Sequence, residues 1–291
     1  MHKAGFVNII GLPNVGKSTL LNLLLGDNLS IVTPKPQTTR HRILGIYNDE
    51  NTQIVFSDTP GFINEPHYQL HKVMNSFIEG TFKDADVVLY VAEPDIKNQE
   101  ELSRFIGIKK IKCPIICIIN KVDLSNQNKL DNTIEHINKS KIFKEVIPVS
   151  ALYKFNTEKI IPLLTSLLPR HEPYYPKEDL SDRNMRFFVS EIIREKILSF
   201  YHKEIPYSTE VLTEEYKEKE NITAIKAFIF VERESQKMII LGKNGEAIKK
   251  LGISARKDIE KFIDSKVYLD LTVKVLKNWR NDINILKKLG Y

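Results

Sequence analysis

The sequence has few cysteines and no long apolar run, and both absences narrow the kind of protein it can be. Only two of its 291 residues are cysteine, Cys113 and Cys117. Two thiols cannot build a disulfide-stapled scaffold or a zinc finger, so we expect buried, reduced side chains. No apolar stretch reaches the about 18 residues that a membrane-spanning helix needs. No signal-peptide pattern precedes Phe6, where the first predicted strand begins, so we expect a cytoplasmic protein.

Internal repeats and low-complexity segments are also absent from the sequence. The net charge of +6 is compatible with a polyanionic partner. The length allows two domains. Prolines interrupt the chain without periodicity in 171–185, which predicts a linker between a domain at 1–170 and a second domain at 186–291.

The first 170 residues alternate apolar strands with helical patterns, which predicts an α/β fold. Such alternation gives a mostly parallel sheet with helices on both faces and a ligand at the carboxyl ends of the strands. The predicted strands are 6–10, 45–47, 53–56, 87–91, 115–119 and 146–149.

A phosphate-binding loop follows the first predicted strand. Its residues are Gly11, Leu12, Pro13, Asn14, Val15, Gly16, Lys17 and Ser18, and Thr19 opens a predicted helix that ends at Leu25. The glycines let backbone N–H groups face phosphate oxygens, Lys17 supplies a charge, and the Ser18 hydroxyl can ligate Mg²⁺. The sequence therefore predicts a P-loop nucleotide site.

Three later segments, each after a predicted strand, narrow the ligand to a guanine nucleotide. The first segment is Asp58, Thr59, Pro60 and Gly61. The Asp58 carboxylate, at the end of a strand, is suited to binding magnesium, and the flexible Gly61 backbone can sense the terminal phosphate. The second segment is Asn120, Lys121, Val122 and Asp123, whose last carboxylate can accept two hydrogen bonds from guanine but not from adenine. Ser150 and Ala151 can present backbone N–H groups to the guanine oxygen. Together these segments predict GTP binding.

Hydrolysis requires a liganded Mg²⁺, an oriented water and a positive charge near the transferred phosphoryl group. We expect Ser18 and Thr39 to ligate the metal, with Thr38 as an alternative. Phe62 stands where many GTPases have a water-orienting glutamine, so no catalytic residue is assigned and slow intrinsic turnover is expected. A switch segment that responds to the nucleotide is predicted at Gln37, Thr38, Thr39, Arg40 and His41. Arg40 and Arg42 are expected at the surface or facing RNA, and His41 at the surface instead of acting as a general base.

The second half carries a G-x-x-G loop between an apolar stretch and an amphipathic helix, which is typical of a KH domain. The loop is Gly242, Lys243, Asn244 and Gly245, and the basic residues beyond it are Lys249, Lys250, Arg256 and Lys257. Such a loop clamps single-stranded RNA. The surrounding pattern predicts an α+β, type II KH arrangement. Within it we expect a solvated helix or turn at 214–220 and a closing helix at 279–289. The Trp279 side chain is expected either to pack inside the domain or to stack on an RNA base.

The whole chain resembles the Era family of GTPases, in the TrmE-Era-EngA-like superfamily. The resemblance rests on the P-loop, the run from Pro36 to Arg42, the Asp58, Asn120 and Ser150 motifs, and the KH segment. It implies binding to the 3′ end of small-subunit (16S) rRNA, a role in 30S ribosome assembly, and at most a peripheral contact with the cytoplasmic face of the inner membrane. In related G domains the P-loop asparagine holds K⁺; Asn14 either does so here or only stabilises the loop. The chain departs from the family after Ala151, where Lys-Gly usually follows.

Two other functions remain open at this point. The first is a membrane-associated signalling GTPase whose RNA binding is incidental. The second, a metabolic kinase, is disfavoured by the Asn120 and Asp123 pair.

Overall fold

The computed structural model describes residues 2–63, 65–81, 84–94 and 111–291. Contacts divide the chain into two compact units. The first unit contains Met1–Ser30, Thr39–Glu65 and Met74–Asp182, and the second contains Ile31–Thr38, Pro66–Val73 and Arg183–Tyr291. Two short pieces of the N-terminal half thus belong to the C-terminal unit. No helix in the described part of the chain is long and apolar enough to cross a membrane.

The first unit is built on a six-stranded sheet of order β2-β3-β1-β4-β5-β6. Only β2 is antiparallel to its neighbour, so the expected mostly parallel sheet is confirmed. The central strands are apolar on both sides, as burial under helices on both faces requires. The strands are β1 (Lys3–Gly11), β2 (Ile43–Asn48), β3 (Thr52–Asp58), β4 (Val87–Ala92), β5 (Ile115–Ile119) and β6 (Glu145–Pro148).

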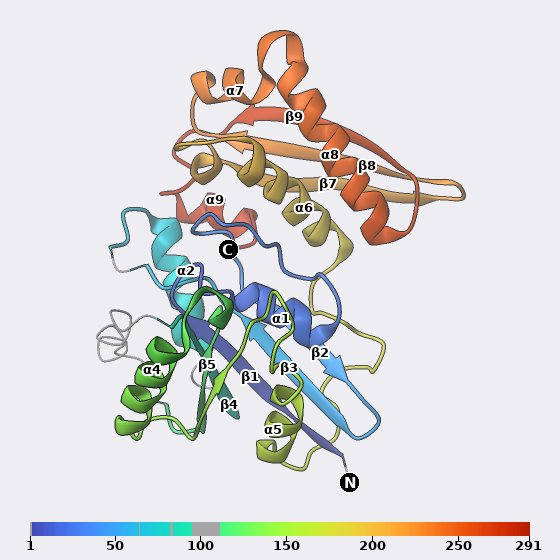
Figure 1. Ribbon diagram of the computed structural model, residues 1–291. Coiled ribbons are helices and arrows are strands. Elements are labelled where there is room, and N and C mark those ends of the chain that lie inside the picture. The colour runs from blue at the N-terminus through green and yellow to red at the C-terminus, as the bar shows by residue number, and fades with distance from the viewer. Residues whose placement is uncertain (1, 64, 82–83, 95–110) are drawn as a thin grey trace. The chain divides into compact units, whose positions relative to one another are not determined.

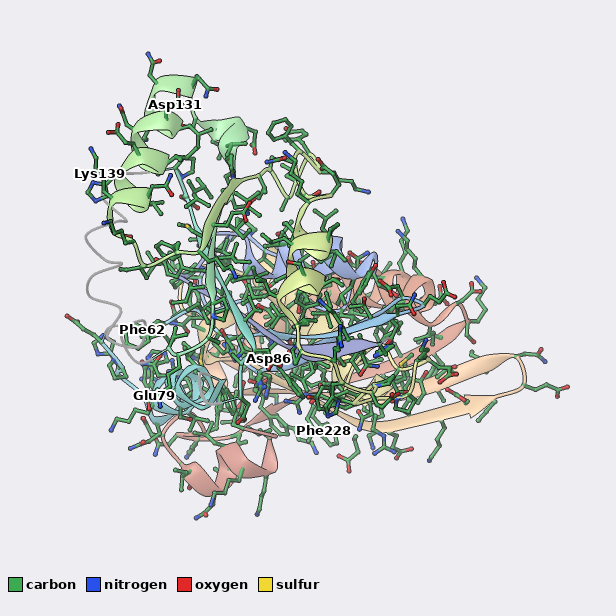
Figure 2. All side chains as sticks on the ribbon, turned by 90° about the horizontal axis from the view of Figure 1, so that it is seen from below. Phe62, Glu79, Asp86, Asp131, Lys139 and Phe228 are labelled. Atoms are coloured by element: carbon green, nitrogen blue, oxygen red, sulfur yellow. The ribbon has the colours of Figure 1, made fainter. Side chains whose placement is uncertain are left out.

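Helices cover both faces of this sheet. On one face, α1 (Lys17–Leu25) and α5 (Ile160–Leu167) pack their apolar side chains against the sheet. On the other face lies α4 (Gln127–Lys139). Figure 2 labels Asp131 and Lys139, which lie on the exposed side of α4. A further helix, α2, spans Gln69–Thr81. Because the parallel strands end at one edge, the loops after them gather there.

The second unit is a three-stranded sheet with helices on one face (Figure 1). Inward-facing residues alternate along β8, and they pack against apolar side chains of α6 and α8. The strand β7 pairs antiparallel with β8, and β9 pairs parallel with it. The elements are α6 (Met185–Phe200), β7 (Glu210–Lys219), β8 (Ile222–Val231), α7 (Glu234–Leu241), α8 (Glu246–Ile263), β9 (Val267–Val275) and α9 (Ile283–Lys288). This element order is the predicted α+β KH arrangement.

Two local predictions in this unit are wrong. The charged stretch 214–220 is not a helix or turn, because most of it forms the outer half of β7, paired with β8 in a hairpin. The closing helix is shorter than predicted, because residues 277–281 form turns and α9 begins only at Ile283. Trp279 packs inside: it is fully buried, and its Nε1 donates to the Ser208 carbonyl oxygen at 3.0 Å.

The proline-containing stretch before α6 lies along the first unit instead of extending freely from it. The backbone N–H groups of Tyr174 and Tyr175 both donate to Gln53 Oε1, at 2.7 and 3.0 Å. Farther along, Ile46 N–H donates to the Leu180 carbonyl oxygen at 2.9 Å. Residues 174–180 are therefore held by β2 and β3.

Candidate nucleotide-binding site

The P-loop has a backbone that only glycine allows at two positions. Gly11 ends β1 with φ 149°, and a Cβ there would lie 2.3 Å from the Val91 carbonyl oxygen. Gly16 has φ 96°, and its Cβ would lie 2.2 Å from Asn120 Nδ2. The loop therefore lies too close to β4 and to Asn120 for a side chain at either position. The turn between Gly11 and Gly16 is formed by Leu12, Pro13, Asn14 and Val15. Thr19 lies in the first turn of α1.

Lys17, the first residue of α1, lies inside the loop that precedes it. Its Nζ donates to the carbonyl oxygens of Gly11 at 3.1 Å and Leu12 at 2.8 Å. Burial lowers the pKa of Lys17 to about 8, and the Asp58 carboxylate opposes that shift. The ammonium group is therefore mostly charged at neutral pH and can neutralise phosphate oxygens.

Oxygen atoms suited to Mg²⁺ converge beside the loop. Ser18 Oγ donates to Asp58 Oδ2 at 2.7 Å and lies 3.0 Å from Thr39 Oγ1. Asp58 is fully buried, and its Oδ1 accepts no hydrogen bond from the described residues. Burial raises the pKa of Asp58, while the Ser18 hydroxyl and the Lys17 charge lower it. Because Mg²⁺ prefers hard oxygen ligands, this donor set fits the metal.

The structure distinguishes the two threonines that the sequence left open as metal ligands. Thr39 faces Ser18, as described above. The Thr38 hydroxyl instead donates to the Lys35 carbonyl oxygen and lies 2.6 Å from Thr33 Oγ1. The geometry therefore favours Thr39 over Thr38.

The Asn120 segment braces the P-loop from the end of β5. Asn120 Nδ2 donates to the Val15 carbonyl oxygen, and its Oδ1 accepts from Ala151 N–H, both at 2.9 Å. Lys121 has φ 62°, and its Nζ donates to the Asn14 carbonyl oxygen at 2.6 Å. One side chain thus joins the P-loop to the Ser150 segment, and its neighbour closes over the loop.

Asp123 and Ser150, which the sequence predicts to recognise guanine, lie together in the structure. Ser150 Oγ donates to Asp123 Oδ1 at 2.5 Å, while Asp123 itself is exposed within the short helix Val122–Leu124. The loop after Ala151 is closed by paired backbone hydrogen bonds between Ser150 and Phe155, at 3.2 and 3.0 Å. Lys154 in this loop has φ 56°. The departure from the family sequence therefore leaves a defined turn.

The segment after Asp58 packs tightly on the P-loop. Thr59 Oγ1 donates to the Ile9 carbonyl oxygen at 3.1 Å, which fixes the start of the segment. After Pro60, a Cβ at Gly61 would lie 2.7 Å from the Pro13 ring, so only glycine fits there. Phe62, labelled in Figure 2, follows directly and offers no polar group that could orient water.

The prediction of surface positions is wrong for two of the switch residues. Arg40 is fully buried and His41 is 5% exposed. These residues lead directly into β2, which pairs with β3, so their side chains pack into the unit. Arg42 is half-buried and its Nε donates to Ser57 Oγ in β3 at 2.8 Å. Gln37 lies in the segment that belongs to the second unit, with φ 59°.

One contact of the site was missed in the sequence. Glu93 Oε1 lies 2.5 Å from Lys121 Nζ, so a carboxylate at the end of β4 balances the lysine that closes over the P-loop. The sequence signal for Glu93 was its place directly after an apolar strand. The ion pair itself could not be predicted, because Lys121 is 28 residues away along the chain.

In the second unit, the G-x-x-G loop projects polar groups from between two helices. Gly242 has φ 72° with a Cβ that would lie 2.5 Å from Ala247 Cβ, and Gly245 has φ 76°. Lys243 and Asn244 at its tip are exposed. Exposed basic residues continue along α8, and they are Lys249, Lys250, Arg256 and Lys257. Apolar side chains are also exposed on α7 and α8, at Met238, Ile239 and Ile253.

Comparison with known proteins shows the same two-part organisation. The family model described as 50S ribosome-binding GTPase matches residues 6–121, and the KH domain model matches residues 204–280. GTPase Era of Geotalea daltonii is 43% identical over 290 residues, covering 99% of this chain and 97% of that protein. GTPase Era of Clostridium kluyveri is 42% identical over 294 residues, covering all of both chains.

The chain belongs to the Era family of GTPases. It has an N-terminal P-loop GTPase domain and a C-terminal KH domain, and its enzymatic activity is GTP hydrolysis.

Two Era structures match the fold over the whole chain. One is Era in complex with MgGDPNP and nucleotides 1506–1542 of 16S ribosomal RNA, with a TM-score of 0.93 and 36% identity, covering 100% of this chain and 99% of that chain. The other is an Aquifex aeolicus Era variant bound to GDP·AlF₄⁻, also with a TM-score of 0.93 and 36% identity, covering 99% of both chains.

Proposed function

We propose that this chain binds the 3′ region of 16S rRNA under the control of its bound nucleotide and acts in assembly of the 30S ribosomal subunit. The observation that carries the proposal is the full-length match to the Era structure that contains both MgGDPNP and 16S nucleotides 1506–1542. The exposed G-x-x-G loop and the P-loop of this chain have the chemistry that these two ligands need.

The nucleotide-binding residues proposed here act in three groups. Backbone N–H groups of the P-loop, with Lys17, receive the phosphates. Asp123 accepts the N1–H and 2-amino group of guanine. The backbone N–H groups of Ser150 and Ala151, which the sequence predicts to reach the guanine oxygen, instead donate to the Phe155 carbonyl oxygen and to Asn120 Oδ1. The segment from Asp58 to Gly61 detects the terminal phosphate. Asn120 and Lys121 hold these groups together through the bonds to Val15 and Asn14.

Mg²⁺ would be held by Ser18 and Thr39 directly and by Asp58 through its hydration shell. When bound, the ion neutralises charge on the transferred phosphoryl group. The buried Asp58 carboxylate, whose Oδ1 accepts no hydrogen bond from the described residues, supports this assignment.

Hydrolysis lacks two usual contributors among the described residues near the site. Phe62 cannot orient water, Arg42 is engaged with Ser57, and Arg40 is buried in the fold. We therefore expect slow intrinsic turnover that a partner or a cation accelerates. Asn14 is the proposed K⁺ ligand. Turnover measured at equal ionic strength should be faster in potassium than in sodium, and equal rates would contradict the role of Asn14.

Nucleotide control of RNA binding would run through residues 31–38. This segment lies between the P-loop helix and Thr39 but belongs to the unit that carries the KH fold. Lys35 Nζ donates to the carbonyl oxygens of Leu198 and Tyr201 at the end of α6. A change in the nucleotide at Thr39 would therefore act on a segment anchored to α6.

The test is filter binding of the full chain to the 3′-terminal segment of 16S rRNA and to a scrambled RNA, at fixed salt and with a non-hydrolysable GTP analogue. The test variant is Lys243→Asp/Asn244→Asp. A charge-matched control is Lys219→Asp/Asn221→Asp, at exposed positions of the β7–β8 hairpin in the same unit.

We expect selective binding to the 3′ segment, loss of at least tenfold in affinity in the G-x-x-G variant, and a change of less than threefold in the control. Equal binding to both RNAs, or equal loss in both variants, would contradict sequence-selective binding by this loop. Binding to acidic lipid vesicles that both variants weaken equally, together with unselective RNA binding, would instead favour a membrane-associated GTPase.

A further inference from the structure

Ser30 is held in place by a single side chain of the P-loop helix. Asn22, on α1, donates from Nδ2 to the Ser30 carbonyl oxygen at 2.7 Å, and its Oδ1 accepts from Ser30 N–H at 2.9 Å. Both backbone polar groups of Ser30 are thus satisfied by one amide. Because asparagine is a poor residue for a helix interior, its position here is explained by this pair of bonds.

The Ser30 hydroxyl is buried beside the candidate magnesium site. The residue is 4% exposed, and its side chain lies beside the Asp58 carboxylate. The two groups do not meet the geometry of a regular hydrogen bond, and neither Ser30 Oγ nor Asp58 Oδ1 has a hydrogen-bond partner among the described residues. Buried polar atoms are nearly always paired, so two such oxygens in one place point to a ligand with donor groups.

Ser30 also occupies a defined place in the chain. It is the last residue of the first unit before residues 31–38 pass to the second unit, and Thr39 is the first residue after them. Thr39 Oγ1 lies 3.0 Å from Ser18 Oγ, which in turn donates to Asp58. Both ends of the segment 31–38 are therefore fixed next to the same carboxylate.

We propose that Ser30, fixed by Asn22, is a positioning residue of the magnesium site whose hydroxyl bonds the hydration shell of the metal together with Asp58. This assignment rests on the proposed nucleotide function and deepens it. A hydrated Mg²⁺ carries the donor O–H groups that the two buried oxygens can accept. The bonds from Asn22 fix the backbone of Ser30 to α1 and so hold its hydroxyl in this place.

The experiment measures the dissociation rate of a fluorescent GDP from the full chain as a function of free Mg²⁺, and again in EDTA. The variants are Ser30→Ala and Asn22→Ala. Ser166→Ala, on the exposed end of α5, is the matched control, since its hydroxyl only donates to the Leu163 carbonyl oxygen. Ser30→Thr keeps a hydroxyl and serves as the conservative variant.

For Ser30→Ala we expect the Mg²⁺ concentration at half-effect to rise about tenfold, the loss typical of residues that orient a metal's ligands. The rate in EDTA should stay within twofold of the unaltered chain. Asn22→Ala should give the same pattern more weakly, Ser30→Thr should restore the response, and Ser166→Ala should change nothing.

An unchanged Mg²⁺ response in Ser30→Ala would overturn the role of Ser30. The role of Ser30 would also be overturned if GDP dissociated faster from Ser30→Ala in EDTA by the same factor as in Mg²⁺. Such a result would mean that the substitution loosens the nucleotide site without acting through the metal. If Ser30→Ala does not fold, an unchanged response in Asn22→Ala has the same consequence. An unaltered chain whose GDP dissociation ignores Mg²⁺ would contradict the proposed magnesium site itself.

Discussion

The guanidinium group of Arg194 donates a hydrogen bond to the backbone carbonyl oxygen of Thr38, the residue directly before Thr39. Arg194 lies on α6 and is 1% exposed. Its charge is balanced by Glu191, which accepts from Nε at 2.8 Å and from Nη2 at 2.6 Å. A buried, paired arginine is rigid, so the carbonyl that it holds is fixed to α6.

Removing this bond should weaken the link between nucleotide and RNA without removing the nucleotide site. Arg194→Ala alone would leave Glu191 buried and unpaired, at a cost of about 3–5 kcal/mol in unfolding free energy. The better variant is Arg194→Gln/Glu191→Gln, which removes both charges and leaves a polar side chain at each position. We expect the ratio of RNA affinities with the GTP analogue and with GDP to fall at least fivefold, measured by filter binding.

The control for this variant is Glu135→Gln/Lys139→Gln, which removes an exposed ion pair on α4. It should leave the ratio unchanged. Affinity for the analogue itself should stay within twofold in both variants, and an unchanged ratio in the Arg194 variant would show that this bond carries no coupling.

Gly16→Ala should abolish tight nucleotide binding. The new methyl would lie 2.2 Å from Asn120 Nδ2, at a φ of 96° that alanine avoids. We expect at least a tenfold loss in affinity for fluorescent GDP. Gly80→Ala is the matched control, since that helical position has open space around it. It should raise unfolding free energy by about 0.5–1 kcal/mol in thermal denaturation, and equal binding by both variants would refute the P-loop assignment.

Base selection can be tested at the pair formed by Asp123 and Ser150. In Asp123→Ala, the ratio of the affinities for GTP and for inosine triphosphate should fall at least tenfold, because inosine lacks the 2-amino group that the carboxylate binds. Ser150→Ala removes one hydrogen bond to the carboxylate and should reduce GTP affinity about fivefold, corresponding to about 1 kcal/mol. Competition against fluorescent GDP measures both, and an unaltered preference in Asp123→Ala would place the base elsewhere.

The two thiols should react at very different rates. Burial raises the pKa of Cys117 to about 12, and this residue is fully buried in β5. Its thiolate fraction at pH 8 is on the order of 1 in 10,000, whereas Cys113 is half-buried. Native protein treated with a thiol reagent at pH 8 should modify Cys113 only. Cys113→Ser should abolish this labelling and Cys117→Ser should not; equal labelling rates in the native state would contradict the burial of Cys117.

The nucleotide motifs could be predicted from the sequence because each is a short run with fixed spacing after an apolar strand. The P-loop from Gly11 to Ser18 depends on neighbours in the chain, and its setting between β1 and α1 is local. The KH fold could be predicted for the same reason, since the loop at Gly242 and the elements around it follow one another along the sequence.

Features that depend on distant partners could not be predicted. Arg40 looks like a surface residue until the pairing of β2 with β3 buries it. The charged outer half of β7 has no strand pattern of its own, and only the hairpin with β8 makes it extended. The assignment of residues 31–38 to the second unit depends on Lys35 and Arg194, whose partners are more than 150 residues away along the chain.

The most direct test of nucleotide-controlled RNA binding is the dissociation constant of the unaltered chain for the 3′-terminal 16S rRNA segment, measured with a non-hydrolysable GTP analogue and with GDP at one salt concentration. We predict binding at least tenfold tighter with the analogue, and by linkage the RNA should tighten analogue binding by the same factor. Equal dissociation constants in the two nucleotide states would contradict the account.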